Sequence, residues 1–427
     1  MTETLGVYLR SGHDETRVGS LVRDRRDMIR FITDASYIEL GEDRPVLSSS
    51  MLFVGDEERT VGHLKSGRFT QPGRDLPPWF GNLLPEGALR DMVSRGLPSG
   101  RTSDFDILRY LGEDLPGGVI VRSEDGVELD GLVTPSTEVA TESGTIKFSL
   151  AGVQLKMSML KQDERLTFPA TGTNGDIIAK LPSTRYAFLP EVEFTCMKLA
   201  EAAGVVMPHC ELVPAASVSG IRAEALSGGD YVLAVTRFDR TADGGRVHIE
   251  DFCQVMEVPK ERKYTAANEE TVMNIAKRLG GGTRGFLEIA RRLAVNILMG
   301  NGDAHLKNHS LIYSDPRVGG ISPAYDLVAT FLYDGSDDLA LKFRNTNNSA
   351  IVGMARFARA AELCGITENV VRKFVTHTVE QAADTWPALI GDLPMPADFA
   401  KKLVDRAQRL QLSGELNVSF APGAAAD

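Results

Sequence analysis

The spacing of apolar residues changes once along this chain of 427 residues, near residue 241. Before that point, short β-branched and aromatic runs such as "GVYLR" (6–10) and "YVLAVTRFDR" (231–240) alternate with Gly, Asp and Pro, which is typical of strands. After it, runs such as "GFLEIARRLAVNILMG" (285–300) have the apolar spacing of helices. A chain of this length exceeds one compact core, so we expect a strand-rich part, a helical part and a ligand-binding cleft between them.

Within this division the sequence predicts three structured parts and a tail. Residues 1–100 form a mixed N-terminal module, residues 101–240 a strand-rich part, residues 241–420 a helical part, and residues 421–427 a disordered tail. The helix expected over 191–204 is the exception in the strand-rich part. The segment 309–328, "HSLIYSDPRVGGISPAYDLV", is the exception in the helical part and predicts a strand, a turn and a second strand.

Composition excludes several classes of protein. The net charge of −11 argues against a chain that binds nucleic acid by itself, because such chains carry a basic surplus. No apolar run approaches the roughly 20 residues that span a bilayer, and the N-terminus does not read as a signal peptide, so we expect a cytoplasmic protein without membrane contact. The four cysteines, Cys196, Cys210, Cys253 and Cys364, form no CxxC pair and are expected to be buried thiols.

The segment "MGNGDAHLKN" (299–308) carries the main chemical signal. Asp303 and Asn308 have the Asp-x4-Asn spacing of a kinase catalytic loop, in which the Asp orients the acceptor hydroxyl and the Asn binds a metal ion. The predicted hairpin would return Asp326, in "DLV", to the side of this loop. Because Mg²⁺ prefers one or two carboxylates with phosphate oxygens and water, Asp326 and Asn308 form a suitable pair of ligands.

The other parts of a phosphotransfer site can be sought upstream. Lys180 ends the apolar strand "DIIAK" and could contact phosphates, as the strand lysine of kinases does. Glu193, with Glu191 as the rival, could support that lysine from the following helix. The turn "SLAGVQLK" (149–156) could cover the phosphates with backbone N–H groups. Each match alone is weak, and their order along the chain carries the inference.

Together these segments resemble the HipA-type serine/threonine kinases, which are toxins of bacterial type II toxin–antitoxin pairs. The resemblance covers nearly the whole chain. It rests on "WFGNLLPEG" (79–87), "FSLAGVQLKMSML" (148–160), "IIAKLP" (177–182), "EVEFTCMKLAEAAG" (191–204), "RFDR" (237–240), "GNGDAHLKN" (300–308) and "SPAYDLVAT" (322–330), in the order of the family.

The resemblance implies an α+β fold: a two-lobed protein kinase with a strand-rich N-lobe, a helical C-lobe and an extra N-terminal mixed α/β subdomain. It implies an ATP- and Mg²⁺-dependent protein serine/threonine kinase in which Asp303 is the catalytic residue and Asn308 and Asp326 complete the catalytic set and hold the metal. The residues implied in nucleotide binding are Ala151, Gly152, Val153, Gln154, Lys156, Lys180, Thr236, Phe238, His305, Lys307 and Tyr325, and Glu193 is implied as the supporting ion-pair partner. Val153 and Leu155 depart from the loop pattern of other members.

The same resemblance implies regulation and partners. Ser149 matches the serine that family members autophosphorylate, and a phosphate there would compete with those of ATP and expel the loop. A HipB-like helix-turn-helix antitoxin would neutralise the kinase and supply the DNA contacts. The expected substrate is an aminoacyl-tRNA synthetase, the glutamyl type above others, whose phosphorylation would inhibit translation and growth and lead to persistence.

Three alternatives remain open at this stage. A small-molecule kinase of the aminoglycoside or choline kinase type has a similar Asp-x4-Asn loop but lacks the "NLLPEG" module and the "SLAGVQ" turn. A pseudokinase could bind a partner without catalysis. A direct DNA-binding regulator would need a basic stripe, which this sequence does not show.

Overall fold

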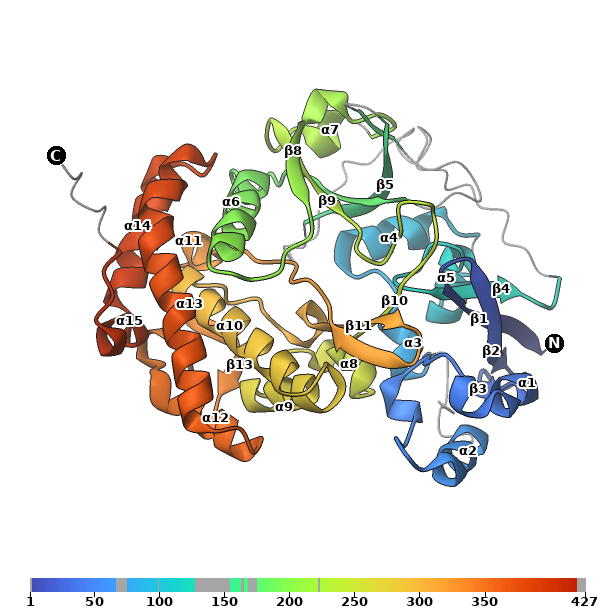
Figure 1. Cartoon of the computed structure of the whole chain (residues 1–427). Coiled ribbons are helices and arrows are strands. Elements are labelled where there is room, and N and C mark those ends of the chain that lie inside the picture. The colour runs from blue at the N-terminus through green and yellow to red at the C-terminus, as the bar shows by residue number, and fades with distance from the viewer. Residues whose placement is uncertain are drawn as a thin grey trace. The chain divides into compact units, whose positions relative to one another are not determined.

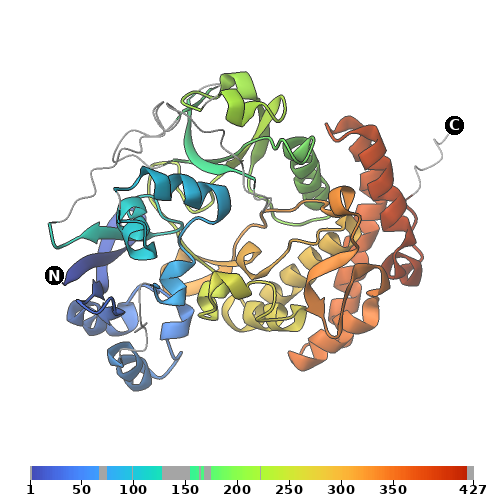
Figure 2. The ribbon, with the colours of Figure 1, turned by 180° about the vertical axis from the view of Figure 1, so that it is seen from behind.

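The computed structural model describes residues 2–66, 75–98, 100–126, 154–162, 165–167, 175–221 and 223–420. The chain divides into two compact units, which Figures 1 and 2 show from opposite sides. Unit 1 consists of Met1–Arg185, Val213–Lys260 and Ile312–Gly319, and unit 2 consists of Tyr186–Leu212, Glu261–Leu311 and Gly320–Asp427. Each unit is assembled from segments that are distant in the sequence.

An antiparallel sheet with the order β3-β2-β1-β4 begins unit 1. Its strands are β1 Glu3–Ser11, β2 Asp14–Arg23, β3 Ile29–Thr33 and β4 Val119–Ser123. Alternate side chains such as Leu5, Val7 and Leu21 are fully buried, as the period of a half-buried strand requires. The strand predicted from "GVYLR" (6–10) lies within β1 and is therefore confirmed.

Helices complete the core of this sheet. They are α1 Ala35–Glu39, α2 Glu57–Lys65, α3 Pro78–Gly81, α4 Gly87–Gly96 and α5 Asp104–Leu111. Ser103 caps α5, because its side chain accepts a hydrogen bond from the Asp106 backbone N–H. Since Phe105 of α5 and Val119 of β4 share one buried cluster with Trp79, the packed body continues beyond the predicted boundary at residue 100.

A five-stranded sheet with the order β6-β5-β7-β9-β8 follows. Its strands are β5 Lys156–Gln162, β6 Arg165–Thr167, β7 Ile177–Lys180, β8 Cys210–Pro214 and β9 Tyr231–Thr236. Met159, Ala179 and Ala234 are buried in one apolar cluster on one face of the sheet. The short helix α7 Ala223–Leu226 contributes side chains to the same cluster.

A fully buried carboxylate joins distant segments of unit 1. Glu250, in β10 His248–Asp251, accepts hydrogen bonds at one oxygen from Ser48 Oγ (2.8 Å) and Trp79 Nε1 (3.2 Å). The other oxygen accepts from the Ser49 backbone N–H at 2.8 Å and from the Tyr313 hydroxyl. Each oxygen thus has two donors, which is how a protein accommodates a buried charge.

Unit 2 is mainly helical. Its helices are α6 Leu189–Ala202, α9 Glu269–Leu279, α10 Thr283–Met299, α11 Phe331–Asp334, α12 Met354–Leu363, α13 Glu368–Leu389, α14 Ala397–Arg409 and α15 Gln411–Leu416. The long helix α13 packs against α6, α10 and α12, as the orange helix of Figures 1 and 2 shows. The predicted helix over 191–204 ends as expected at Gly204, whose φ is +85°.

The predicted hairpin is also confirmed. It consists of β11 Ser310–Asp315 and β12 Val318–Ile321 and forms a three-stranded sheet in the order β10-β11-β12. A smaller pair is formed by β13 Asp338–Phe343 and β14 Thr346–Asn348, and α8 Phe252–Val255 directly follows β10. The division into units runs through β11 and β12, because residues 312–319 belong to unit 1.

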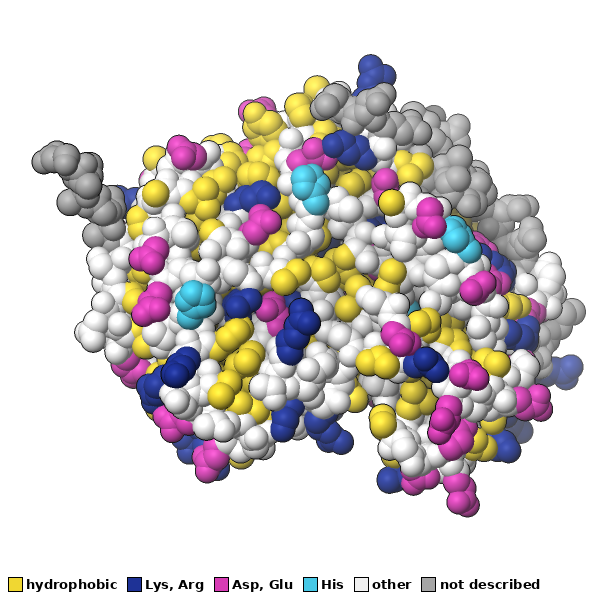
Figure 3. Space-filling model, in the orientation of Figure 1, with side chains coloured by type: hydrophobic (Ala, Val, Ile, Leu, Met, Phe, Trp, Pro, Cys, Tyr) yellow, Lys and Arg dark blue, Asp and Glu magenta, His cyan; other side chains and the backbone are white. Residues whose placement is uncertain are grey.

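The surface carries charges of both signs. Lys and Arg side chains are interspersed with Asp and Glu on the face shown in Figure 3. In the part of the chain that the structure describes, no helix is both long enough and apolar enough to cross a membrane. All four cysteines are buried free thiols, as predicted.

Candidate active site

The loop with Asp303 begins where α10 ends. Gly300 adopts φ 70° and ψ 42°, a left-handed conformation that lets the chain leave the helix. A Cβ atom at this position would lie 2.5 Å from the Phe331 ring and 2.9 Å from Arg406 Nε. The buried Arg406 also donates to the carbonyls of Ile297 (2.5 Å) and Leu298 (3.1 Å), which satisfies the end of α10. The helix end and its glycine therefore fix where the loop starts.

Hydrogen bonds inside the loop join Asp303 to Asn308. The Asn308 side-chain Nδ2 donates to the Asp303 backbone carbonyl at 2.8 Å, and the His305 N–H donates to the same carbonyl at 2.8 Å. On the other side, Asn301 Oδ1 accepts from the Asp303 N–H at 3.0 Å, and Asn301 Nδ2 donates to Asn296 Oδ1 at 3.0 Å. The Asp-x4-Asn spacing is thus folded into one closed turn. The Asp303 side chain remains exposed.

The orientation of the Asn308 amide suits a metal ion. Because a carbonyl can only accept, the group that faces the Asp303 carbonyl must be the Asn308 amide nitrogen. The amide oxygen accepts no hydrogen bond from any residue that the structure describes, although the side chain is only 8% exposed. An amide oxygen with a carboxylate from Asp326 is the hard-oxygen donor set that Mg²⁺ prefers, so the residues fit this ion.

The segment that follows β12 carries "YDL" (325–327), and Tyr325 contacts the end of the loop. The Tyr325 hydroxyl donates to the Lys307 carbonyl at 2.8 Å and lies 2.5 Å from Ser310 Oγ. These contacts place the Tyr325 side chain against the segment that contains Asn308, and the approach of Asp326 to Asn308 stays a prediction. The backbone φ of Asp326 is +57°, which is uncommon outside glycine and costs about 1 kcal/mol. Such strain is frequent at functional sites, where it directs a side chain.

Thr330, which sequence reasoning missed, binds the backbone at the start of the loop that carries Asp303. Its hydroxyl accepts from the Gly302 N–H at 2.8 Å and donates to the Gly300 carbonyl at 3.3 Å. The Phe331 N–H donates to the same carbonyl at 3.2 Å. Thr330 could not be selected from the sequence, because nothing in "DLVAT" marks it as a hydrogen-bond partner of a segment about 30 residues upstream.

The two histidines of the loop are buried. His305 lies edge-on to the Tyr264 ring, with centroids 4.9 Å apart. Burial, reinforced by the neighbouring Arg292 and His305, lowers the pKa of His309 to about 3, so His309 is neutral at pH 7. Tyr264 also donates a hydrogen bond from its hydroxyl to Asp303 Oδ1 at 2.6 Å, a contact that sequence reasoning did not anticipate.

In unit 1, two of the predicted nucleotide-binding lysines face each other. Lys156 of β5 and Lys180 of β7 are register partners, and Lys180 is also opposite Leu233 of β9. Directly opposed residues project from the same face of a sheet, which here is the face opposite Ala179 and its apolar cluster. The two predicted phosphate-binding lysines thus share one face of the sheet, where Lys180 is 4% exposed.

The other predicted nucleotide-binding residues on or next to this sheet differ in the face or the group that they contact. Gln154 Nε2 donates to the Leu181 carbonyl at 3.0 Å, so its amide nitrogen binds the backbone. Thr236 is opposite Ile177 and, by strand alternation, its side chain projects from the face opposite Lys180. Phe238 lies just beyond β9 and is half-buried.

The "RFDR" motif forms a buried ion network around Phe238. Arg237 donates to Asp239 Oδ1 (3.0 Å) and Oδ2 (2.8 Å) and to Asp114 Oδ1 (3.0 Å), while Arg240 contacts both carboxylates as well. Burial alone would raise the pKa of Asp239, but the two guanidinium groups lower it below its usual range. The motif therefore anchors the end of β9, where Thr236 and Phe238 are predicted to contact the nucleotide, to the segment after α5.

Some predictions fall elsewhere. Ser149, Ala151, Gly152, Val153 and the tail 421–427 lie outside the described residues. Glu193 and its rival Glu191 are both buried in α6, at 1% and 7% exposure. The half-buried Lys307 contributes its carbonyl to Tyr325.

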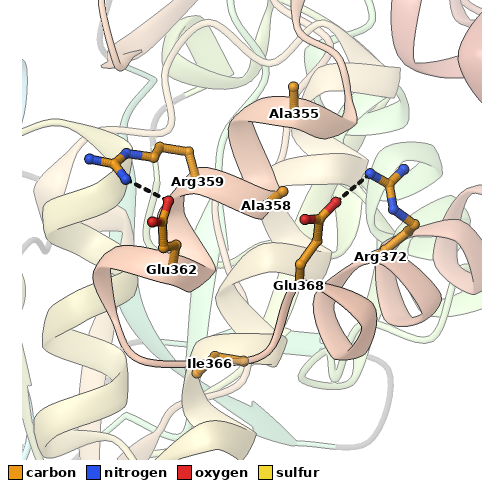
Figure 4. Close-up of a pocket in the computed structure, with 7 residues that line it drawn as sticks. All are labelled: Ala355, Ala358, Arg359, Glu362, Ile366, Glu368 and Arg372. Atoms are coloured by element: carbon orange, nitrogen blue, oxygen red, sulfur yellow. Dashed lines mark hydrogen bonds and ion pairs between the residues drawn. The ribbon is translucent and has the colours of Figure 1, made fainter.

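A hollow of about 400 Å³ lies between α12 and α13. As Figure 4 shows, it is lined by Ala355, Ala358, Arg359, Glu362, Ile366, Glu368 and Arg372. Its charged side chains form the ion pairs Arg359–Glu362 and Glu368–Arg372 at the surface. No predicted site residue lines it, so the spacing of chemical groups along the sequence, and not this hollow, locates the candidate site.

Comparison with known proteins supports the resemblance to the HipA-type kinases that the sequence motifs indicate. Residues 148–386 match the HipA-like C-terminal domain, and residues 9–122 match the HipA N-terminal domain. The chain is 37% identical over 401 residues to Y4dM of Sinorhizobium fredii, a protein named only provisionally as a kinase, covering 92% of this chain and 94% of that protein. It is 22% identical over 347 residues to the serine/threonine-protein kinase toxin HipA of Shewanella oneidensis, covering 73% and 77% of the two chains.

Among solved structures, a chain of the Shewanella oneidensis complex of HipA, HipB and operator DNA has the same fold. The TM-score is 0.72 at 20% sequence identity, over 96% of this chain and 99% of that chain. Two family domains that together cover most of the sequence, with a relative that aligns over nearly its whole length, establish that this chain belongs to the family of HipA-type kinases.

Proposed function

We propose that this protein is a serine/threonine kinase toxin that transfers the γ-phosphate of ATP to a protein. The observation that carries the proposal is the closed turn in which Asn308 Nδ2 binds the Asp303 carbonyl at 2.8 Å while the Asp303 carboxylate stays exposed. A turn that only connected two elements would not need an exposed carboxylate beside an amide oxygen that accepts no hydrogen bond from the described residues. Phosphoryl transfer needs both groups, one for the acceptor hydroxyl and one for the metal.

The proposed ligands follow from the chemistry of each side chain. Lys156 and Lys180 bind phosphate oxygens, and Asn308 and Asp326 hold Mg²⁺. Held by these two residues, Mg²⁺ would supply positive charge to offset the negative charge that develops on the phosphate oxygens. Glu193 of α6 is proposed to support Lys180. Phe238 and the backbone at Thr236 border the adenine, since the Thr236 side chain projects from the other face of the sheet. Gln154, His305, Lys307 and Tyr325 shape the surrounding site.

In the proposed reaction, Asp303 accepts the proton of a serine or threonine hydroxyl. The hydroxyl oxygen forms a bond to the γ-phosphorus, the bond from that phosphorus to the β,γ-bridging oxygen breaks, and ADP leaves with the electron pair. Positioning and charge stabilisation provide most of the rate enhancement, since the protein forms no covalent bond itself. An exposed Asp303 can meet a side chain presented by another protein.

The biological proposal extends to partners. We propose autophosphorylation at Ser149, neutralisation by a HipB-like antitoxin through which DNA is bound, and an aminoacyl-tRNA synthetase as substrate. The support is the family membership, together with the names of the Shewanella oneidensis toxin and complex. The net charge of −11 is compatible with DNA contacts supplied by a separate chain.

The test is an incubation of the purified chain with Mg·ATP, followed by intact-mass measurement and peptide mapping, beside Asp303→Asn. One added phosphate on Ser149 that is absent in the variant is the expected result. ATP binding without any added phosphate would favour a small-molecule acceptor, which a screen of aminoglycosides and choline would detect. ATP at 100 times its Kd should raise the free energy of unfolding by about 2.7 kcal/mol, which a thermal-shift assay detects. If ATP causes no such shift, only the reading as a binding module is left.

A further inference from the structure

Tyr264 makes a direct contact with the proposed catalytic carboxylate. Its hydroxyl donates to Asp303 Oδ1 at 2.6 Å, which is the short distance expected for a hydrogen bond to a charged acceptor. Tyr264 precedes Asp303 by 39 residues and lies in none of the motifs that define the site. The residue is 43% exposed, so burial of its ring does not explain why the hydroxyl points at the carboxylate.

The backbone around Tyr264 is fixed against the loop. The N–H groups of Thr265 and Ala266 both donate to the Arg262 carbonyl, at 3.0 and 2.9 Å, which makes a tight turn. The Leu306 N–H donates to the Lys263 carbonyl at 3.3 Å and ties this turn to the loop itself. Lys263 directly precedes Tyr264, and Leu306 follows Asp303 by three residues, so this bond joins the two backbone segments that carry the pair.

The ring is held on two sides. The His305 ring meets it edge-on, with centroids 4.9 Å apart and an interplanar angle of 83°. The Lys263 ammonium lies 5.5 Å from the ring centroid, within the range of a cation–π contact. With the ring held in this way, the hydroxyl of Tyr264 has a defined position, and the carboxylate oxygen that it binds is defined too.

The contact makes the two carboxylate oxygens of Asp303 different in their hydrogen bonding. Within the described part of the chain, Oδ2 of Asp303 accepts no hydrogen bond, whereas Oδ1 accepts from Tyr264. A carboxylate on an exposed loop would otherwise rotate about χ2 and present its oxygens in many directions. A general base must lie within hydrogen-bond reach of the proton that it removes, in a fixed geometry.

We propose that Tyr264 is a positioning residue, which holds Asp303 through Oδ1 so that Oδ2 faces the acceptor hydroxyl. This inference rests on the proposed function, because it assigns Asp303 the role of base. The opposite role, a gate in which the Tyr264 hydroxyl occupies the place of the acceptor, predicts faster transfer when the hydroxyl is removed. The two roles therefore differ in the sign of the effect.

The test compares Tyr264→Phe, which keeps the ring against His305, with Tyr264→Ala, which removes both ring and hydroxyl. Tyr8→Phe is the matched control, because Tyr8 Oη donates to Glu124 at 2.9 Å in the N-terminal sheet and so loses an equivalent bond elsewhere. The readout is phosphate incorporation by intact mass at a series of Mg·ATP concentrations. This separates the maximal rate from the half-saturating ATP concentration.

We expect Tyr264→Phe and Tyr264→Ala to lower the maximal rate alike, by about 10- to 100-fold, without changing half-saturation. Tyr8→Phe should match the wild type. A fully active Tyr264→Phe beside a slow Tyr264→Ala would reduce the role to ring packing and overturn the proposal, and a faster Tyr264→Phe would replace it with the gate. If the wild type incorporates no phosphate, the proposed function fails and this inference with it.

Discussion

Two carboxylates show how the same chemical group is used in different ways in this protein. Glu250 is fully buried in unit 1, and each of its oxygens accepts two hydrogen bonds. Asp303 is exposed in unit 2, and its carboxylate accepts one hydrogen bond, from Tyr264, within the part of the chain that the structure describes. The first group is saturated, and the second retains an oxygen for another partner.

The comparison separates a structural role from a chemical one. Four donors compensate the cost of burying Glu250, and in return the carboxylate links four segments of unit 1. Those donors leave it no capacity to bind or react. Asp303 is instead held through its backbone by Asn301, His305 and Asn308, which leaves the side chain available. Replacing each acid by its amide distinguishes these roles, because shape is kept while charge and acceptor capacity change.

Asp303→Asn should have the largest effect, and on activity alone. Loss of the proposed base is expected to reduce phosphate transfer about 10²- to 10⁴-fold, because an amide cannot accept the proton. The side chain is exposed, so the free energy of unfolding should stay within about 0.5 kcal/mol of the wild type. Radiolabel transfer and urea denaturation measure the two quantities. A loss of stability comparable with that of a core mutation would contradict the comparison.

Glu250→Gln should show the reverse pattern. The amide nitrogen cannot accept, so two donors among Ser48, Trp79, Ser49 and Tyr313 lose their acceptor inside the protein. We expect a loss of about 2–4 kcal/mol in the free energy of unfolding. Glu362→Gln, at an exposed ion pair with Arg359, is the control and should change it by less than about 0.5 kcal/mol. Equal denaturation midpoints for the two variants would mean that the Glu250 network adds little.

Glu269 extends the comparison, because it is buried and no side chain or backbone group in the described part of the chain forms such a network with it. It is 3% exposed at the start of α9, and burial together with Glu270 raises its pKa to about 8. Since the folded state then binds a proton that the unfolded state releases above about pH 4.5, stability should fall as the pH rises from about 4.5 to 8.

Glu269→Gln should remove this part of the pH dependence. Because structural relaxation and water limit the cost of the buried charge, we expect the variant to gain about 2 kcal/mol over the wild type at pH 8 and to match it near pH 4.5. Urea titrations at a series of pH values measure the difference. Glu270→Gln is the neighbouring control, and a wild-type curve parallel to that of Glu269→Gln would contradict the assignment.

The smallest effect is expected at the hollow in Figure 4. Arg372 pairs with Glu368 across one helical turn at 2.6 Å, and both side chains are about half exposed. Arg372→Ala should lower the free energy of unfolding by only about 0.3–0.5 kcal/mol, and added salt should reduce this difference. A loss above about 1 kcal/mol that salt does not alter would show that the surface pair behaves like the buried network.

Much of the fold could be predicted, because local patterns are strong where faces are buried. The helices of the C-terminal half, the N-terminal strands and the hairpin over 310–321 all follow the period of their apolar residues. The predicted boundary at residue 100 did not anticipate that β4 pairs with β1, since strand pairing over more than 100 residues leaves no local signal. The three-part division itself stays a prediction.

Part of the candidate site could also be predicted, again from local patterns in the sequence. Asp303, Asn308 and Asp326 could be selected because chemistry requires those residue types in that order, and the hairpin between them was visible as a local pattern. Tyr264 and Thr330 could not, because their roles depend on single hydrogen bonds to distant segments. A tyrosine 39 residues away from an aspartate has no property in the sequence that marks it as a partner.

By itself, therefore, the sequence determined the order of elements, the family and the candidate residues for the proposed phosphotransfer, since each depends on local spacing or on residue type. Only the tertiary structure decided which oxygen of Asp303 is held, which face of the sheet carries Lys156 and Lys180, and which carboxylate is saturated. These depend on directions and distances between side chains that fold together from remote parts of the chain, and hydrogen bonds are sensitive to differences of a few tenths of an ångström.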